Sequence, residues 1–145
     1  MAKPEAWQLN RAVYPMLTVV ETRFQDLDPQ QHLNNVSYAA IFETARFRLD
    51  QRYAGGITGN TGDRRVLAAQ DINFLGEGRF PEPVEVGMGI ERMGTSSFTL
   101  LAAGFQSGGC IATCRSTIVF MADDTVCPVP AYVREIAETL LIRQP

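Results

Sequence analysis

Hydrophobic and polar residues change their spacing early in the chain. Residues 13–24 (VYPMLTVVETRF) are rich in β-branched and aromatic side chains and end in polar alternation. This composition predicts a strand with Pro15 near its start. Residues 25–32 are mostly polar and predict a loop.

A helix is expected after that loop. It should begin at Asn34 or Asn35 and run to about Tyr53, because the stretch contains no Gly or Pro and Asn is a good helix cap. Its first half is apolar on nearly every side, which indicates a buried helix. Its second half is expected to reach water through Arg46, Arg48, Asp50, Gln51 and Arg52.

The rest of the chain is predicted to be mostly extended. Glycines in residues 55–62 (GGITGNTG) should end the helix. Strands are predicted at residues 66–76, 84–93, 98–106 and 110–122. Short turns join the last three strands, including one at 107–109 whose glycines accept a positive φ, so an antiparallel meander is expected. Residues 131–142 have apolar positions at helical spacing and predict a C-terminal helix.

These elements indicate an α+β fold in one domain spanning residues 1–145. One strand, one apolar helix and four further strands suggest a long antiparallel sheet wrapped around a central helix. Such a sheet leaves an edge or a face uncovered, and association of two copies would cover it.

Composition narrows the chemistry. The chain has 145 residues, a net charge of −3 and one histidine, His32, which excludes metal sites built from several histidines. Arginines are scattered, and Arg64, Arg65, Arg79 and Arg115 are interpreted as solvated, so nucleic-acid binding is disfavoured.

The sequence also predicts where the protein resides. No apolar run is long enough for a signal peptide or a membrane span, and the three cysteines are interpreted as small buried side chains in a reducing compartment. Cys110 and Cys114 lie in one predicted strand, too far apart for a disulfide. We therefore expect a cytoplasmic protein.

Residues 23–43 (RFQDLDPQQHLNNVSYAAIFE) contain the candidate chemistry. Polar side chains crowd the entry to the buried helix at Asp26, Asp28, Gln30, His32, Asn34 and Asn35. A carboxylate and the only imidazole lie beside helix-end N–H groups that carry partial positive charge, so this stretch supplies a base or nucleophile, a proton carrier and an oxyanion-stabilising site. This chemistry requires no metal and no cofactor.

Structural roles are the alternatives for the same residues. Asp28 before Pro29 is a common turn pair, and His32 could bond a backbone carbonyl. Capping suits Asn34 and Asn35, and a core position suits Tyr38. Asp26 is interpreted as a partner of Arg23, and Glu43 as a partner of Arg46 or of a second subunit.

The same stretch resembles the hotdog-fold thioesterases of the 4-hydroxybenzoyl-coenzyme A thioesterase type. Their motif is approximately R-[FYW]-x-D-x-D-x-x-G-H-V-N-N-x-x-Y, followed by an aromatic residue and Glu. It is matched by Arg23, Phe24, Asp26, Asp28, His32, Asn34, Asn35, Tyr38, Phe42 and Glu43, with Leu33 in place of Val. The loop is also similar to the D-x-N-Q-H-V-N-N of plant acyl-ACP thioesterases. Gln31 and Gln30 depart from the usual Gly and Asn of these two patterns.

This resemblance implies a hotdog fold and hydrolysis of an acyl thioester carried on coenzyme A or an acyl-carrier protein. It implies that Asp28 is the nucleophile or general base, and that His32 helps to position water or the carbonyl. Gln30, Asn34, Asn35, Val36 and Tyr38 are then candidates for substrate or oxyanion binding. A homodimer or homotetramer with active sites at subunit interfaces is expected.

Two other functions remain open because the fold hosts several. A noncatalytic module that binds acyl thioesters is the main alternative, and steady acyl-CoA hydrolysis would separate it from an enzyme. A hotdog hydratase is less favoured, since its usual Asp and His lie on a different segment.

Overall fold

The computed structural model describes residues 3–53 and 63–144, so the glycine-rich stretch 55–62 lies outside the described residues. Two helices, α1 (Asn35–Tyr53) and α2 (Ala131–Glu138), accompany six strands. The strands are β1 (Met16–Val20), β2 (Asp63–Phe74), β3 (Val84–Met93), β4 (Ser97–Gln106), β5 (Gly109–Ala122) and β6 (Thr125–Val126). Short 3-10 helices span Ala6–Leu9, Arg11–Val13 and Phe24–Asp26.

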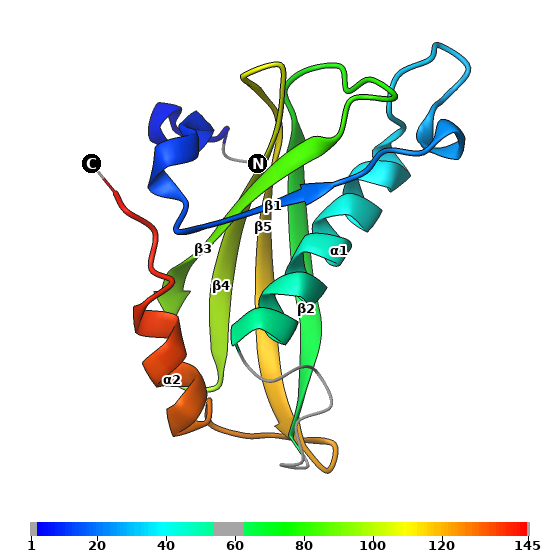
Figure 1. Ribbon diagram of the computed structural model, residues 1–145. Helices are drawn as coiled ribbons and strands as arrows, with labels where there is room; N and C mark the ends of the chain where they lie inside the picture. The colour runs from blue at the N-terminus through cyan, green and yellow to red at the C-terminus, as the bar shows by residue number, and fades with distance from the viewer. Residues whose placement is uncertain (1–2, 54–62, 145) are drawn as a thin grey trace.

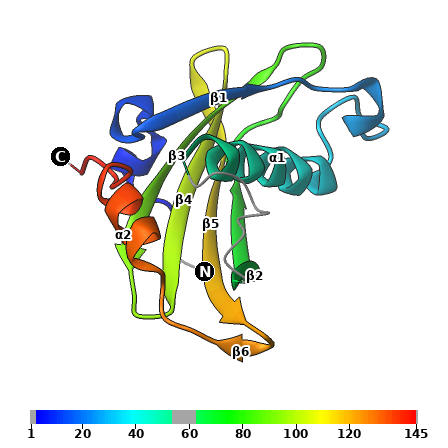
Figure 2. The same cartoon turned by 60° about the horizontal axis from the view of Figure 1, so that its bottom comes forward.

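The strands form one antiparallel sheet that curves around α1. Its order is β1-β3-β4-β5-β2, with β6 paired to β5. Figures 1 and 2 show α1 lying along one face of this sheet, while α2 lies near the far end of β3. The predicted meander of the last three long strands is confirmed, and so is the hotdog arrangement that the resemblance implied.

One side of α1 supplies the centre of the core. Phe42 and Ala45 are almost fully buried, as is Phe120 of β5. The opposite side is open, because Val36 is 71% exposed and Phe47 is 44% exposed. The prediction of a helix buried on nearly every side is therefore correct for the sheet-facing side and wrong for the other side of this single chain.

The strand expected over 66–76 is instead Asp63–Phe74. Two other predicted boundaries are wrong for identifiable reasons. The strand expected over 13–24 is only Met16–Val20, because both of its flanks form 3-10 helices instead. The helix expected to reach residue 142 ends at Glu138, because the chain turns there and bonds to β3. The N–H of Ile90 donates to the Leu140 carbonyl, and the N–H of Ile142 donates to the Ile90 carbonyl at 3.0 Å.

The β4–β5 turn and the cysteines agree with the sequence predictions in part. The turn between β4 and β5 has Ser107 at φ 49° and Gly108 at φ 77°, so one of its two positive-φ residues is a serine. All three cysteines are free thiols, as expected, but only Cys114 is buried, whereas Cys110 and Cys127 are half-buried near the ends of the sheet's last strands, so the prediction of buried side chains is wrong for those two. Within the described residues, no helix is both long enough and apolar enough to cross a membrane.

Candidate functional site

The candidate site is a tight hairpin that leads into α1. Leu27 and Leu33 form an isolated antiparallel bridge that closes it. Inside the hairpin, the N–H of Asp28 donates to the His32 carbonyl at 2.8 Å, and the N–H of Gln31 donates to the Asp28 carbonyl at 2.9 Å. We call residues 27–33 the site hairpin. It brings Asp28 and His32 together, as the sequence suggested.

The Asp28 carboxylate is held by one of its two oxygens. Oδ1 accepts the backbone N–H of Gln30 at 2.9 Å and that of His32 at 3.2 Å. Within the part of the chain whose side chains are described, no hydrogen bond reaches Oδ2. The side chain is therefore fixed in direction while one oxygen stays available, a combination that suits a nucleophile or a general base.

The backbone conformation of Gln31 explains why the resembled motif usually has glycine at this position. Its φ is 62°, in the left-handed region that favours glycine. The hairpin forms with glutamine, at a backbone cost of about 1–2 kcal/mol.

We expect Gln31→Gly to raise the free energy of unfolding by about 0.5–1 kcal/mol, the left-handed cost less the extra entropy of an unfolded glycine. Urea titration of the two proteins measures the difference. Gln30→Gly is the control, since Gln30 lacks a positive φ and its replacement should only lower stability. A less stable Gln31→Gly variant would contradict this explanation.

Asp26 anchors the start of the site hairpin. Its carboxylate accepts the backbone N–H of Arg23 at 2.8 Å, the Arg23 guanidinium at 2.8 Å and the Ser37 hydroxyl at 3.3 Å. Burial raises the pKa of Asp26, but the hydrogen bonds and charge of Arg23 outweigh burial and hold that pKa below its ordinary value. The interpretation of Asp26 as a loop-holding partner of Arg23 is confirmed.

We expect Asp26→Asn to lower the free energy of unfolding by about 2 kcal/mol at neutral pH, because charge-assisted hydrogen bonds are lost. A folded pKa below the unfolded one stabilises the fold above about pH 4 and stops doing so as the pH falls through the folded pKa. The difference from wild type should therefore shrink in acid. Chemical unfolding between neutral and acidic pH tests this, with Asp124→Asn, an exposed carboxylate, as the control. A pH-independent difference would argue against it.

The first turn of α1 presents free backbone donors. Asn34 caps the helix, since its Oδ1 accepts the N–H of Ser37 at 2.8 Å. In the described part of the chain, no acceptor is bonded to the N–H of Asn35 or Val36, and both residues are exposed. These two N–H groups carry the positive end of the helix dipole and remain open to a carbonyl oxygen.

His32 has a partner that local sequence patterns did not reveal. Its Nε2 lies 3.1 Å from the Glu77 carboxylate, and the His32 side chain is 34% exposed. Glu77 follows β2, far along the chain from His32. Only the fold brings the two together, and the position of the predicted strand end near residue 76 was the sole sequence signal.

Tyr38 joins the site hairpin to the segment after β2. Its hydroxyl donates to the Gly76 carbonyl at 3.2 Å and accepts the Gly78 N–H at 3.0 Å. Burial raises the pKa of Tyr38, which keeps the hydroxyl protonated. A Cβ at Gly78 would lie 2.5 Å from Leu33, so the close approach requires glycine. Tyr38 is thus a core residue with a satisfied hydroxyl, as one of the alternatives held.

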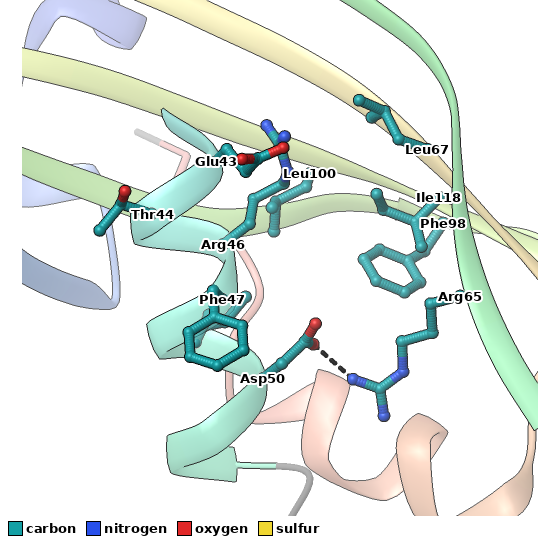
Figure 3. A pocket seen from close by; sticks show the side chains of 11 residues that line it. Glu43, Thr44, Arg46, Phe47, Asp50, Arg65, Leu67, Phe98, Leu100 and Ile118 are labelled. Atoms are coloured by element: carbon teal, nitrogen blue, oxygen red, sulfur yellow. Dashed lines mark hydrogen bonds and ion pairs between the residues drawn. The ribbon is translucent and has the colours of Figure 1, made fainter. Parts of the chain in front are cut away.

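A cavity lies between α1 and β2, beside the C-terminal half of the helix (Figure 3). We call it the α1–β2 groove. Its volume is about 450 Å³, within the usual range for small-molecule sites. Its apolar lining is Phe47, Leu49, Leu67, Phe98, Leu100 and Ile118, and its ionisable lining is Glu43, Arg46, Asp50 and Arg65. No residue of the site hairpin lines it.

Several charged residues that the sequence predicted to be solvated line the groove instead. Arg65 and Asp50 were expected to be solvated, but they form an ion pair with side chains only 13% and 22% exposed. Arg46 turns to the sheet and donates to Gln70 at 2.9 Å. Among the described residues Glu43 forms no ion pair with Arg46. Side chains from α1 and β2 meet only in the folded chain, which is why residue spacing did not reveal them.

The free edge of the sheet lies next to this groove. β2 is an edge strand of 12 residues, whereas β1 at the other edge has five. Leu67 and Phe74 on β2 are 42% and 54% exposed. A long edge strand bearing exposed apolar side chains is prone to pair with another strand.

Comparison with known proteins gives a consistent picture. A family model described as thioesterase-like superfamily matches residues 22–137. None of the curated proteins matches the chain.

Solved structures resemble the chain over nearly its whole length. A Pseudomonas aeruginosa protein is 26% identical, with 93% of this chain and 97% of that chain covered and a TM-score of 0.85. A Thermus thermophilus thioesterase complexed with coenzyme A and zinc is 26% identical, with 88% and 95% covered and a TM-score of 0.80. A thioesterase-superfamily protein from Jannaschia, 19% identical, has a TM-score of 0.82, with 97% and 99% covered, and supports the fold alone.

Proposed function

The chain belongs to the thioesterase-like superfamily and is a thioester hydrolase, and from that premise we propose that it cleaves an acyl-coenzyme A thioester with Asp28 as the nucleophile or general base. The observation that carries this proposal is the Asp28 carboxylate. One oxygen is fixed by two backbone N–H groups and the other has no hydrogen-bond partner among the described residues. An acyl-carrier protein is the alternative carrier of the acyl group.

The proposed reaction takes place at the start of α1. The thioester carbonyl oxygen accepts hydrogen bonds from the N–H groups of Asn35 and Val36, which stabilise the negative charge that develops on it. With Asp28 as general base, it takes a proton from the water that attacks, and that proton later goes to the departing thiolate. With Asp28 as nucleophile, its oxygen bonds to the carbonyl carbon and forms a mixed anhydride as the thiolate leaves, and water then cleaves the anhydride to restore the carboxylate. In both routes the C–S bond breaks, one water is consumed, and the products are the free acid and the thiol.

The other predicted site residues support this geometry. His32, held near Glu77, lies beside Asp28 and positions water or the carbonyl. Gln30 sits at the exposed tip of the site hairpin, where its amide reaches the substrate or the water. Asn34 and Tyr38 position the site without contacting the substrate. Asn34 caps α1, and Tyr38 connects the hairpin to Gly76 and Gly78 through hydrogen bonds.

We further propose that two copies pair through β2 to complete each site. The groove lies at the start of β2, which contributes Leu67, whereas Phe74 at its end packs on Tyr38 with ring centroids 5.3 Å apart. The groove and the site hairpin are thus at opposite ends of β2. Antiparallel pairing of two β2 strands about a twofold axis brings the hairpin of one subunit beside the groove of its partner. The groove then holds the acyl group.

Coenzyme A as the carrier is supported by the Thermus thioesterase, which is complexed with that molecule. A cytoplasmic location is proposed because Cys110, Cys114 and Cys127 are all free thiols, as is usual in reducing compartments. Neither nucleic acid nor a membrane is proposed as a partner.

A thiol-release assay with purified protein tests the activity. Aliphatic and aromatic acyl-CoAs are compared with an acyl-carrier protein bearing the same acyl groups. We expect steady release of thiol from at least one acyl-CoA. Tight binding of acyl-CoA without turnover, even at high protein concentration, would instead indicate a noncatalytic binding module.

A further inference from the structure

A charged pair lies in the α1–β2 groove, and the role inferred for it rests on the proposed function. Asp50, near the end of α1, and Arg65, at the start of β2, form an ion pair at one end of the groove. Figure 3 shows the two side chains reaching toward each other beside Phe98 and Ile118. The pair also borders a small apolar cavity of about 30 Å³ under α2, so it stands between that cavity and the main groove.

An ion pair in this place is costly as a purely structural device. Two charges lose most of their hydration where the surrounding groove is largely apolar, and apolar residues of similar size are often as stable. Burial raises the pKa of the Asp50 carboxyl, and the positive charge and hydrogen bond of Arg65 oppose that shift. A role of the ion pair in substrate binding would explain why two charges are desolvated here.

The pair keeps unused hydrogen-bonding capacity. Arg65 donates through Nη1 to Oδ1 of Asp50, and its guanidinium lies 5.4 Å from the centre of the Phe120 ring. Among the residues whose side chains the structure describes, the pair makes no other hydrogen bond. A guanidinium has five N–H donors and a carboxylate about four acceptor positions, so donors and acceptors remain side by side.

The balance of charges in the groove indicates which chemical group would bond to the free donors of Arg65 and the free acceptors of Asp50. Among the side chains that the structure describes, the groove is lined by two carboxylates, Glu43 and Asp50, and two guanidiniums, Arg46 and Arg65, so their formal charges cancel and give an anion no net attraction. An acyl chain that ends in a methyl group would cover Asp50 and Arg65 without replacing the hydrogen bonds that they make to water. A hydroxyl can donate to Asp50 and accept from Arg65 at once.

We propose that the α1–β2 groove selects acyl groups that carry a hydroxyl at their far end, with Asp50 and Arg65 as the specificity-determining residues. The chain between the thioester and this hydroxyl lies along the leucine, isoleucine and phenylalanine lining. Asp50 and Arg65 take no part in bond cleavage, which belongs to the start of the partner's α1.

Matched acyl-CoAs test the proposal. The hexanoyl, octanoyl and decanoyl thioesters are compared with their terminal-hydroxyl and terminal-carboxylate counterparts. At the preferred length, kcat/KM for the hydroxylated substrate should exceed that for the plain one by at least about tenfold, since hydrogen bonds to charged groups are involved. The carboxylate should be the poorer of the two polar substrates.

A double variant separates specificity from stability. Asp50→Leu with Arg65→Met removes both charges together, so no single buried charge is left to unfold the protein. We expect the hydroxyl preference to fall to within about twofold of unity, and a ratio of two substrates is insensitive to the fraction of folded protein. Arg64→Met with Asp124→Asn is the matched control, because it also removes both charges of an ion pair that begins on β2, the two side chains are 57% and 91% exposed, and asparagine tolerates the φ of 62° at Asp124.

The outcomes are distinct. Equal or faster hydrolysis of the plain or carboxylate substrates by wild type overturns the hydroxyl inference and leaves the proposed function standing. A preference that survives in the double variant overturns the assignment to Asp50 and Arg65. Absence of hydrolysis for every thioester, including the aromatic ones, overturns the proposed function and this inference with it.

Discussion

Replacing Asp28 by asparagine is expected to lower kcat for acyl-CoA hydrolysis by at least about 100-fold, the scale typical of a lost general base. The introduced amide still has an oxygen that can accept the backbone N–H groups of Gln30 and His32, so the site hairpin keeps its shape. What is lost is the negatively charged oxygen that attacks or deprotonates water. Thiol release under saturating substrate measures the change.

The control for this Asp28→Asn variant is Asp123→Asn. Asp123 is an exposed aspartate at φ 47°, a backbone conformation that asparagine also tolerates, and it lies outside the site hairpin. We expect its kcat to match wild type, and both variants should unfold at wild-type urea concentrations. An unchanged kcat in Asp28→Asn would remove Asp28 from the mechanism.

Disrupting the β2 edge is expected to have an effect of similar size. Ala68 and Ala69 are exposed near the middle of β2 and do not line the groove. Replacing both with glutamate places like charges from two subunits close to the proposed twofold axis. We expect dissociation to monomers and a loss of at least about 100-fold in kcat/KM, because Asp28 then has no partner groove to orient its substrate.

Sedimentation and thiol release on the same samples test this second prediction. Thr125→Glu with Val126→Glu is the matched control, since β6 is exposed and pairs with β5 away from the β2 edge. The control should keep the wild-type mass, whether that is a dimer or a dimer of dimers. A fully active monomer would contradict the shared site.

Much of the fold could be predicted because its signals are local. The absence of Gly and Pro in 35–53 located α1 to within a residue, and the prolines and glycines that flank residues 84–93 located both ends of β3 correctly. The site hairpin was found through side chains that are adjacent in sequence. Its turn was harder to foresee, because Gln31 adopts a positive φ where glycine would be the usual signal.

The features that were missed depend on contacts between distant segments. Glu77 reaches His32 only after β2 has packed beside α1, and Arg65 reaches Asp50 in the same way. Periodicity assigned Asp50 to the polar, water-facing half of a helix. It had no means to show that this half borders a groove, since the groove's other wall comes from β2, β4 and β5.

Mixing two inactive variants tests most directly the claim that Asp28 of one subunit acts on an acyl group held in the partner's groove. One variant is Asp28→Asn, and the other is Leu100→Trp, in which a buried residue of the groove wall is replaced by a larger side chain that fills the groove. After joint unfolding and refolding in equal amounts, about a quarter of wild-type activity should return, because half of the dimers are mixed and each mixed dimer has one intact site. Activity that stays at the level of the separate variants would contradict the shared site and place the groove and Asp28 in independent roles.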